Sequence, residues 1–175
     1  MANNFNAADD SVIPFTAPGS LKEIGLEKLL FRRVTVVSKL MNRLAGRYLA
    51  REFDITIAEW WMLSQLDEYS PRTLRWLADT TFTDKAQMSR AAASLVERGL
   101  VHRKTDPADA RSVLFSITAE GRAVSAASGE ERREANSKLL SLLSPTDREA
   151  LYSSLEELTA SLLANIQRID DAAGS

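Results

Sequence analysis

The sequence predicts a mainly α-helical chain with one small two-stranded β-hairpin between its helices. Over most of the 175 residues, apolar side chains recur at steps of three and four, which is the period of an amphipathic helix. Residues 20–23, 56–59 and 144–147 (SLKE, TIAE and SPTD) have the spacing of helix-capping boxes. The period changes at 100–117, where strand-forming residues surround an Asp-Pro pair.

The N-terminal part divides into an arm and a long helix. Residues 1–19 are rich in Asn, Asp, Pro and Gly without an apolar period, so we expect a flexible arm. The capping pattern at 20–23 then opens a helix that runs to about Phe53 with one apolar face. A helix of about 30 residues is longer than the core of a small domain covers, so this face is expected to meet a partner.

Three short helices follow within about 40 residues, as a helix-turn-helix unit requires. The first starts at 56–59 and ends before Pro71, and the second occupies 74–79. The third runs from about 84 to 98, capped at its start by Thr83 or Asp84 and stopped by Gly99. Tight polar turns join them.

Residues 100–104 and 112–117 are predicted to be the two strands of the hairpin. In the turn between them Pro107 sets φ, and two Asp side chains can accept hydrogen bonds from backbone amides. Because an isolated hairpin is marginally stable, it must lean on the preceding helices. Residues 55–118 are therefore predicted to form a winged helix-turn-helix, a DNA-binding module in which the hairpin is the wing.

Two further helices complete the chain. One begins at 118–121 and carries the charged run 130–134 (EERRE), expected to be a solvated face. The other is capped at 144–147 and carries an apolar stripe. We expect residues 20–54 and 119–175 to form a helical dimerisation lobe whose uncovered stripes are buried by a second copy of the chain. The stripe of the last helix consists of Leu151, Leu155, Leu158, Leu162, Ile166 and Ile169.

Composition excludes several classes of function. The chain has no cysteine and one histidine, His102, which argues against disulfides, thiol chemistry and His/Cys metal sites. No nucleophile elbow or Gly-rich phosphate loop is present, so neither an enzyme nor a cofactor is predicted. Without an apolar span or a signal-peptide pattern, a cytoplasmic protein that does not enter membranes is expected.

The net charge of −2 conceals an asymmetry. Residues 72–111 carry eight basic and five acidic side chains, a net charge of +3. A basic segment on an acidic frame has the sign that a DNA-reading face needs.

Residues 55–122 resemble the core of the MarR family of transcriptional regulators. The resemblance rests on the order and spacing of six segments: 55–60 (ITIAEW), 77–79 (LAD), 84–90 (DKAQMSR), 99–101 (GLV), 106–111 (DPADAR) and 118–121 (TAEG). It implies a homodimer that binds a pseudo-palindromic double-stranded operator and represses transcription until a small, often aromatic, ligand releases it. The chain departs from the family pattern at Phe82, where glycine is frequent, at Ser94, where arginine is frequent, and at Trp76, where the residue is usually polar.

The first two turns of a recognition helix read bases in the major groove. Gln87 is expected to pair with adenine, Lys85 or Arg90 to reach guanine, and Ala86 to touch a thymine methyl group. Met88 is expected in the core. Contacts to phosphates are expected from Arg72, Thr81, Thr83 and Ser89.

The wing is expected to supply a second DNA contact. Arg111 suits a narrow A·T-rich minor groove, where negative potential is concentrated. Asp109 would repel DNA if it pointed outward, so it is expected to bond turn amides or to orient an arginine.

By resemblance, an effector site is expected where the dimerisation lobe meets the winged helix. Aromatic walls with a cation at one edge suit an aromatic acid or a related thioester. The expected lining is Arg43, Arg47, Tyr48, Trp60 and Trp61. The alternatives are a MarR-type activator and a winged-helix protein-interaction module without DNA-binding activity.

Overall fold

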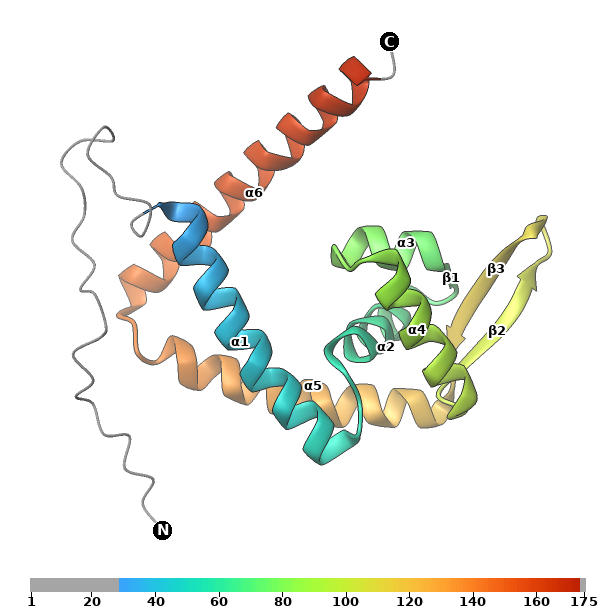
Figure 1. Cartoon of the computed structure of the whole chain (residues 1–175). Coiled ribbons are helices and arrows are strands. Elements are labelled where there is room, and N and C mark those ends of the chain that lie inside the picture. The colour runs from blue at the N-terminus through green and yellow to red at the C-terminus, as the bar shows by residue number, and fades with distance from the viewer. Residues whose placement is uncertain (1–28, 174–175) are drawn as a thin grey trace. The chain divides into compact units, whose positions relative to one another are not determined.

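A computed structural model describes residues 29–173 (Figure 1). The expected arm at 1–19 and the expected capping box at 20–23 lie outside the described residues. The chain divides into two compact units, residues 1–57 and 58–175. Over the described range, none of the helices has the length and apolar character that crossing a membrane requires.

The first unit contains helix α1 (Leu30–Phe53), which ends where the apolar period predicted. Asp54 closes the helix in the left-handed conformation, with φ 53°, and the next amide, that of Ile55, donates to the carbonyl of Leu49. The predicted apolar face is largely exposed: Leu29, Leu30, Val37, Leu40, Met41 and Leu44 all remain accessible.

The second unit begins with the three predicted short helices, which are α2 (Ile57–Tyr69), α3 (Leu74–Thr81) and α4 (Lys85–Glu97). Asp84, one of the two predicted caps, accepts a hydrogen bond from the Gln87 amide at 3.0 Å. Beyond α4, Gly99 adopts the left-handed conformation with φ 71°, as the predicted helix stop requires. Buried apolar residues on all three helices form the core of the module: Met62, Leu63, Leu66, Leu77, Met88, Ala91, Ala92 and Leu95.

The sheet has three strands, one more than predicted. The hairpin strands are β2 (Val101–Asp106) and β3 (Asp109–Ile117), and a two-residue strand β1 (Arg72–Thr73) pairs antiparallel with β3 to give the order β1-β3-β2. The sequence did not reveal β1 because two residues have no detectable period. Through the pairing of Arg72 with Phe115 and Thr73 with Leu114, β1 anchors the base of the wing to the helices.

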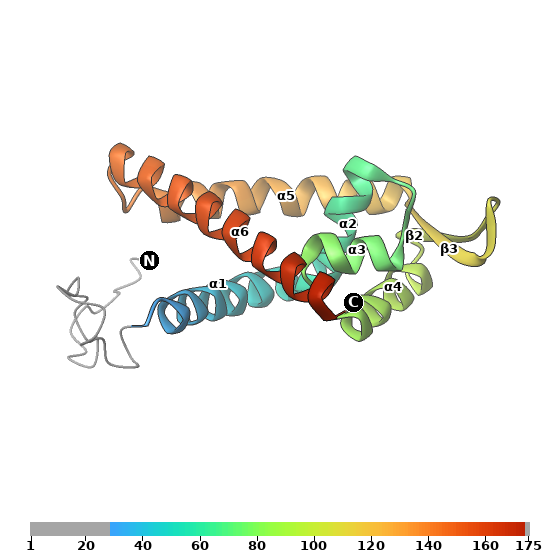
Figure 2. The same ribbon diagram turned by 90° about the horizontal axis from the view of Figure 1, so that it is seen from above.

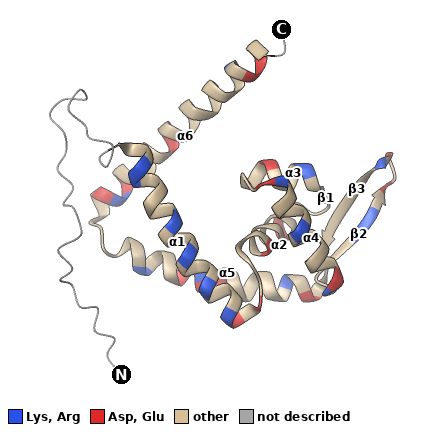
Figure 3. Ribbon diagram, in the orientation of Figure 1, with Lys and Arg blue, Asp and Glu red and all other residues tan. Residues whose placement is uncertain are grey.

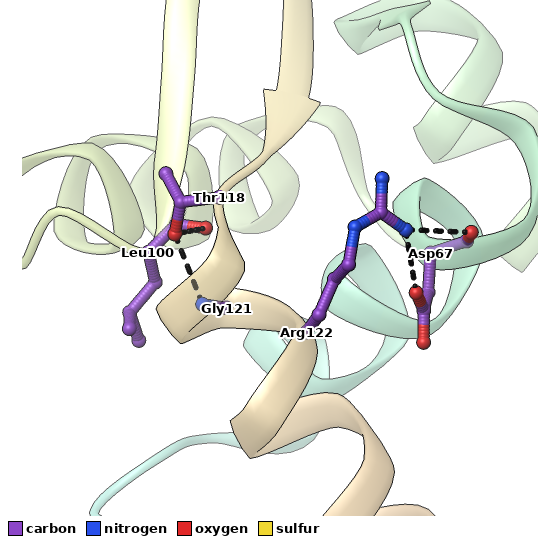
Figure 4. A network of polar contacts seen from close by, with 5 residues as sticks. All are labelled: Asp67, Leu100, Thr118, Gly121 and Arg122. Atoms are coloured by element: carbon purple, nitrogen blue, oxygen red, sulfur yellow. Dashed lines mark hydrogen bonds and ion pairs between the residues drawn. The ribbon is translucent and has the colours of Figure 1, made fainter.

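A polar junction joins the wing to helix α5 (Ala119–Leu140). The side chain of Thr118 caps α5 by accepting from the Gly121 amide at 2.9 Å, and the Thr118 amide donates to the Leu100 carbonyl at 3.1 Å. Arg122 turns from α5 toward Asp67 of α2 and pairs with its carboxylate at 2.9 Å (Figure 4). These contacts fix α5 against the winged helix-turn-helix.

Helix α6 (Pro145–Ala173) follows a short turn in which Ser144 accepts from the Asp147 amide, the predicted cap. None of the α6 residues is buried. The predicted stripe from Leu151 to Ile169 is exposed along its whole length.

Candidate nucleic-acid interface

Helix α4 separates an outward polar face from an inward apolar one. Lys85, Ala86, Gln87, Ser89 and Arg90 are exposed, as a reading helix requires. Met88, Ala91, Ala92 and Leu95 are buried, which confirms the expectation that Met88 is a core residue. Basic residues lie on α4 and along the β2–β3 hairpin, which extends away from the helices of the module (Figures 2 and 3).

The turn before α4 is held by hydroxyl groups. The Thr81 Oγ1 atom lies 2.7 Å from the Leu77 carbonyl and 2.9 Å from Thr83 Oγ1. Phe82 between them is exposed and has φ 51°. Thr81 and Thr83, both candidates for phosphate contacts, are part-buried. Their hydroxyls already form hydrogen bonds within the turn.

At the wing tip, both aspartates bond backbone amides. Asp106 Oδ1 accepts from the Ala108 amide and Asp109 Oδ1 accepts from the Arg111 amide, each at 2.9 Å. Arg111 is exposed, and among the described residues its guanidinium has no ion pair. The tip thus presents a cation on a turn that the two carboxylates stabilise.

Arg72 lies in an aromatic cluster at the strand β1. Its guanidinium stands 4.9 Å from the ring centroid of Trp76 and 6.0 Å from that of Tyr69, and the two rings meet edge to face at 5.6 Å. Its Nε atom is buried without a hydrogen-bond partner among the described residues. The neighbouring Glu68 raises the pKa of Tyr69 by hydrogen bonding and by its charge. Trp76, a departure from the family pattern, packs against the guanidinium of Arg72 and so orders the side chain that is expected to contact phosphate.

The second departure, Ser94, faces the protein rather than the exposed side of α4. Its hydroxyl donates to the carboxylate of Glu59 at 2.5 Å, and Arg98 approaches the same oxygen at 4.0 Å. Glu59 is buried, at 5% exposure. The capping pattern at 56–59 predicted a helix-cap role for Glu59, and no local pattern predicted a role for Ser94, because their contact joins residues 35 positions apart.

A cavity of about 630 Å³ opens between α2 and α5. Trp60 lines it, with the Arg132 guanidinium 4.0 Å above its ring centroid. Burial lowers the pKa of Arg132, because the charged form is partly desolvated. The expectation that the run 130–134 is wholly solvated is therefore wrong at Arg132, whose flat cation packs on an indole. The remaining lining residues are Ser64, Asp67, Glu68, Ser125, Ala126, Gly129, Arg133 and Asn136.

The other residues expected at an effector site are distributed over both units. Trp61 is half-buried with its ring 4.6 Å from that of Trp60, and it is not part of this lining. Arg43, Arg47 and Tyr48 lie on α1 in the first unit. Among the described residues, no group of three or more His, Cys, Asp or Glu side chains is placed to hold a metal ion.

Comparisons with known proteins agree with this geometry. The model of the MarR family matches residues 53–112. The HTH-type transcriptional regulator YxaD of Bacillus subtilis (strain 168), itself uncharacterized, is 31% identical over 102 residues, which cover 58% of this chain and 71% of YxaD.

Two solved structures extend the comparison to the fold. The reduced form of MarR from E. coli is 27% identical with a TM-score of 0.64, over 74% of this chain and 96% of that one. MepR of S. aureus, solved as a DNA complex, has a TM-score of 0.69 at 23% identity, over 77% and 98% of the two chains. The chain belongs to the MarR family of DNA-binding, winged helix-turn-helix transcriptional regulators.

Proposed function

We propose that the protein is a homodimeric repressor that binds a pseudo-palindromic DNA operator and is released by a small aromatic acid or thioester. The observation that carries the proposal is the two-sided helix α4. Its core side fixes it to α2 and α3, while Lys85, Gln87 and Arg90 remain exposed. Such an arrangement suits insertion into the major groove.

The wing supports a second contact on the same duplex. Arg111 at its exposed tip fits a narrow minor groove, and Arg72 fits a phosphate. In this proposal, base contacts from α4 determine the sequence specificity of operator binding, while Arg72 and Arg111 determine the register on the duplex and the affinity.

The exposed apolar helices support a dimer. The stripe of α6, from Leu151 to Ile169, and the apolar face of α1 are larger than the isolated apolar residues usual on a monomer surface. A second copy related by a two-fold axis would cover them and place two α4 helices on half-sites about one helical turn apart.

The cavity beside Trp60 supports the effector. An aromatic ring stacks favourably on an indole, and a carboxylate would pair with Arg132, whose desolvated charge gains from an anion. The cavity lies between α2 and α5, so a ligand bound there would favour one relative placement of these two helices. The ligand would change DNA affinity to the extent that this placement differs from the one that binds DNA.

Selection of bound sequences from random duplex DNA tests the DNA-binding part. We expect an enriched palindrome, and affinity for it that falls steeply as salt rises from 50 to 200 mM. If nothing is enriched and binding is flat with salt, the winged-helix protein-interaction module replaces this proposal. A reporter gene placed behind the selected operator separates repression from activation.

Effector release is tested by adding benzoate, phenylacetate and their coenzyme A thioesters to the protein–operator complex. An active ligand should lower the affinity for the operator. Arg132→Gln should remove the response, whereas Lys138→Gln, an exposed residue of the same helix, should keep it. A response unchanged by Arg132→Gln would move the effector site away from this cavity.

A further inference from the structure

The turn between α3 and α4 contains an unusual backbone conformation. Among the described residues, two non-glycine residues have positive φ, Asp54 and Phe82. Aspartate enters the left-handed region with comparative ease because its short side chain bonds locally, whereas a bulky aromatic residue is disfavoured there. Phe82 is therefore the conformational outlier of the described chain.

The backbone conformation of Phe82 serves the fold, but its side chain does not. With φ 51° and ψ 32°, Phe82 closes α3, its amide donates to the carbonyl of Asp79, and the next amide, that of Thr83, donates to the carbonyl of Ala78. Glycine would make the same bonds without a Cβ penalty. The ring is 76% exposed, so its burial contributes little to stability. A contact with another molecule would account for a phenyl ring at this position.

The position of Phe82 in the chain indicates that the molecule in contact with its ring is DNA. Phe82 stands two residues before Asp84, the N-cap of α4, so it lies at the end of the helix that carries the exposed Lys85 and Gln87. The flanking Thr81 and Thr83 lie in the same turn, where their hydroxyls bond each other. A duplex that receives the first turn of α4 therefore also meets this turn.

We propose that Phe82 is a direct DNA contact, in which the phenyl ring packs on apolar atoms of the operator at the edge of the groove read by α4. The atoms of this class are thymine C5-methyl groups and deoxyribose carbons. The inference rests on the proposed binding of an operator. It adds an apolar contact at a position where the family pattern has a glycine.

Thermal stability and operator affinity together test the contact, because loss of the ring should leave stability unchanged or higher while it lowers affinity. Phe82→Gly and Phe82→Asn both suit a left-handed residue, so each variant should melt at or above the wild-type temperature. Both should bind the selected operator roughly tenfold more weakly, since each removes the ring from a buried contact. Phe82→Tyr keeps the ring and should bind within about twofold of the wild type.

Replacing operator thymines one at a time by uracil separates the two kinds of DNA atom, since uracil lacks the C5-methyl group. If the ring contacts a methyl group, one thymine per half-site will matter to the wild type but not to Phe82→Gly. If it contacts deoxyribose, no thymine will distinguish the two proteins, although Phe82→Gly remains weaker throughout.

Two outcomes overturn the inference and are distinguishable from each other. If the wild type binds its operator and Phe82→Gly binds it equally well, the ring does not contact DNA, although operator binding stands. If the wild type selects no sequence and shows no salt-dependent binding, the proposed function falls and the contact falls with it.

Discussion

The hydroxyl of Ser94 lies 2.5 Å from the carboxylate of Glu59 and joins the middle of α4 to α2. Glu59 is buried, so its carboxylate oxygens need hydrogen-bond donors from the fold. Arg98, the residue that follows the end of α4, contributes a guanidinium at 4.0 Å. The reading helix is thus held from behind by polar contacts as well as by its apolar face.

Ser94→Ala removes this donor from a buried carboxylate. We expect the free energy of unfolding to fall by about 2 kcal/mol, the usual range for a hydrogen bond to a charged group. Urea denaturation measures the change. Ser89→Ala, on the exposed face of the same helix, is the matched control and should change stability by less than about 0.5 kcal/mol. Equal effects of the two substitutions would argue against the Glu59 contact.

Gly121 allows α5 to start against the wing. A Cβ atom added there would lie 2.2 Å from the Leu100 carbonyl oxygen, which cannot retreat easily because it accepts from both the amide and the hydroxyl of Thr118. We expect Gly121→Ala to destabilise the protein by about 3 kcal/mol, at the upper end of overpacking effects.

Gly129 provides the control on the same helix. A Cβ atom there meets only the Arg133 side chain, at 3.6 Å, so Gly129→Ala should raise stability by up to about 1 kcal/mol through helix propensity. Thermal unfolding of the two variants should shift in opposite directions. A Gly121→Ala protein as stable as the wild type would show that the junction is more adaptable than its distances indicate.

Arg111→Ala should weaken operator binding by about tenfold or more without lowering the melting temperature, because the side chain is exposed at the wing tip. The slope of log affinity against log salt should become shallower by about 1 if the arginine neutralises one phosphate equivalent. Gel shifts at several salt concentrations give both quantities. Arg133→Ala on α5 is the control, and its affinity for the operator should match that of the wild type.

Asp109 offers a test of how the wing tip keeps its shape. Asp109→Ala removes the acceptor of the Arg111 amide, so it should weaken operator binding, whereas Asp109→Asn keeps an acceptor and removes a charge that repels DNA. The asparagine variant should bind at least as tightly as the wild type. If both variants bind equally weakly, the carboxylate charge matters, as it would if it oriented an arginine.

Gln87→Ala should relax sequence preference rather than abolish binding. A bidentate contact to adenine contributes roughly 1–3 kcal/mol of discrimination at one base pair. The Asp84 cap bonds the backbone amide of residue 87, so the substitution leaves the helix start intact. Repeating the selection with the variant should give a motif that is degenerate at one position per half-site. An unchanged motif would remove Gln87 from the set of base contacts.

Much of the winged helix-turn-helix was predictable from sequence because its signals are local. The cap at Asp84, the stop at Gly99 and the helix start at 118–121 each involve residues within a few positions of one another, and all three occur as expected. The inward position of Met88 follows from helical spacing alone. The exposed residues of α4 and the wing tip were likewise predictable, because the helical period of the apolar residues and the turn residues of the wing determine their positions.

The residues that sequence reasoning missed depend on contacts between distant segments. Nothing in the local pattern of 130–134 distinguishes Arg132 from its charged neighbours, and its packing on Trp60 requires α5 to lie along α2. The extra strand β1 exists because β3 passes beside Arg72 and Thr73.

By itself, the sequence determined the order of the helices and hairpin strands, the cap at Asp84 and stop at Gly99 that bound α4, the apolar side of α4 and the chemistry of the wing turn. Tertiary structure decided which polar groups meet: Ser94 with Glu59, 35 residues apart, Arg132 with Trp60, and Arg72 with Trp76 in a cluster that also holds Tyr69. The physical reason is the range of the forces. Capping and turn bonds act within one turn of chain, whereas a buried charge or a stacked cation finds its partner only after the apolar faces have packed.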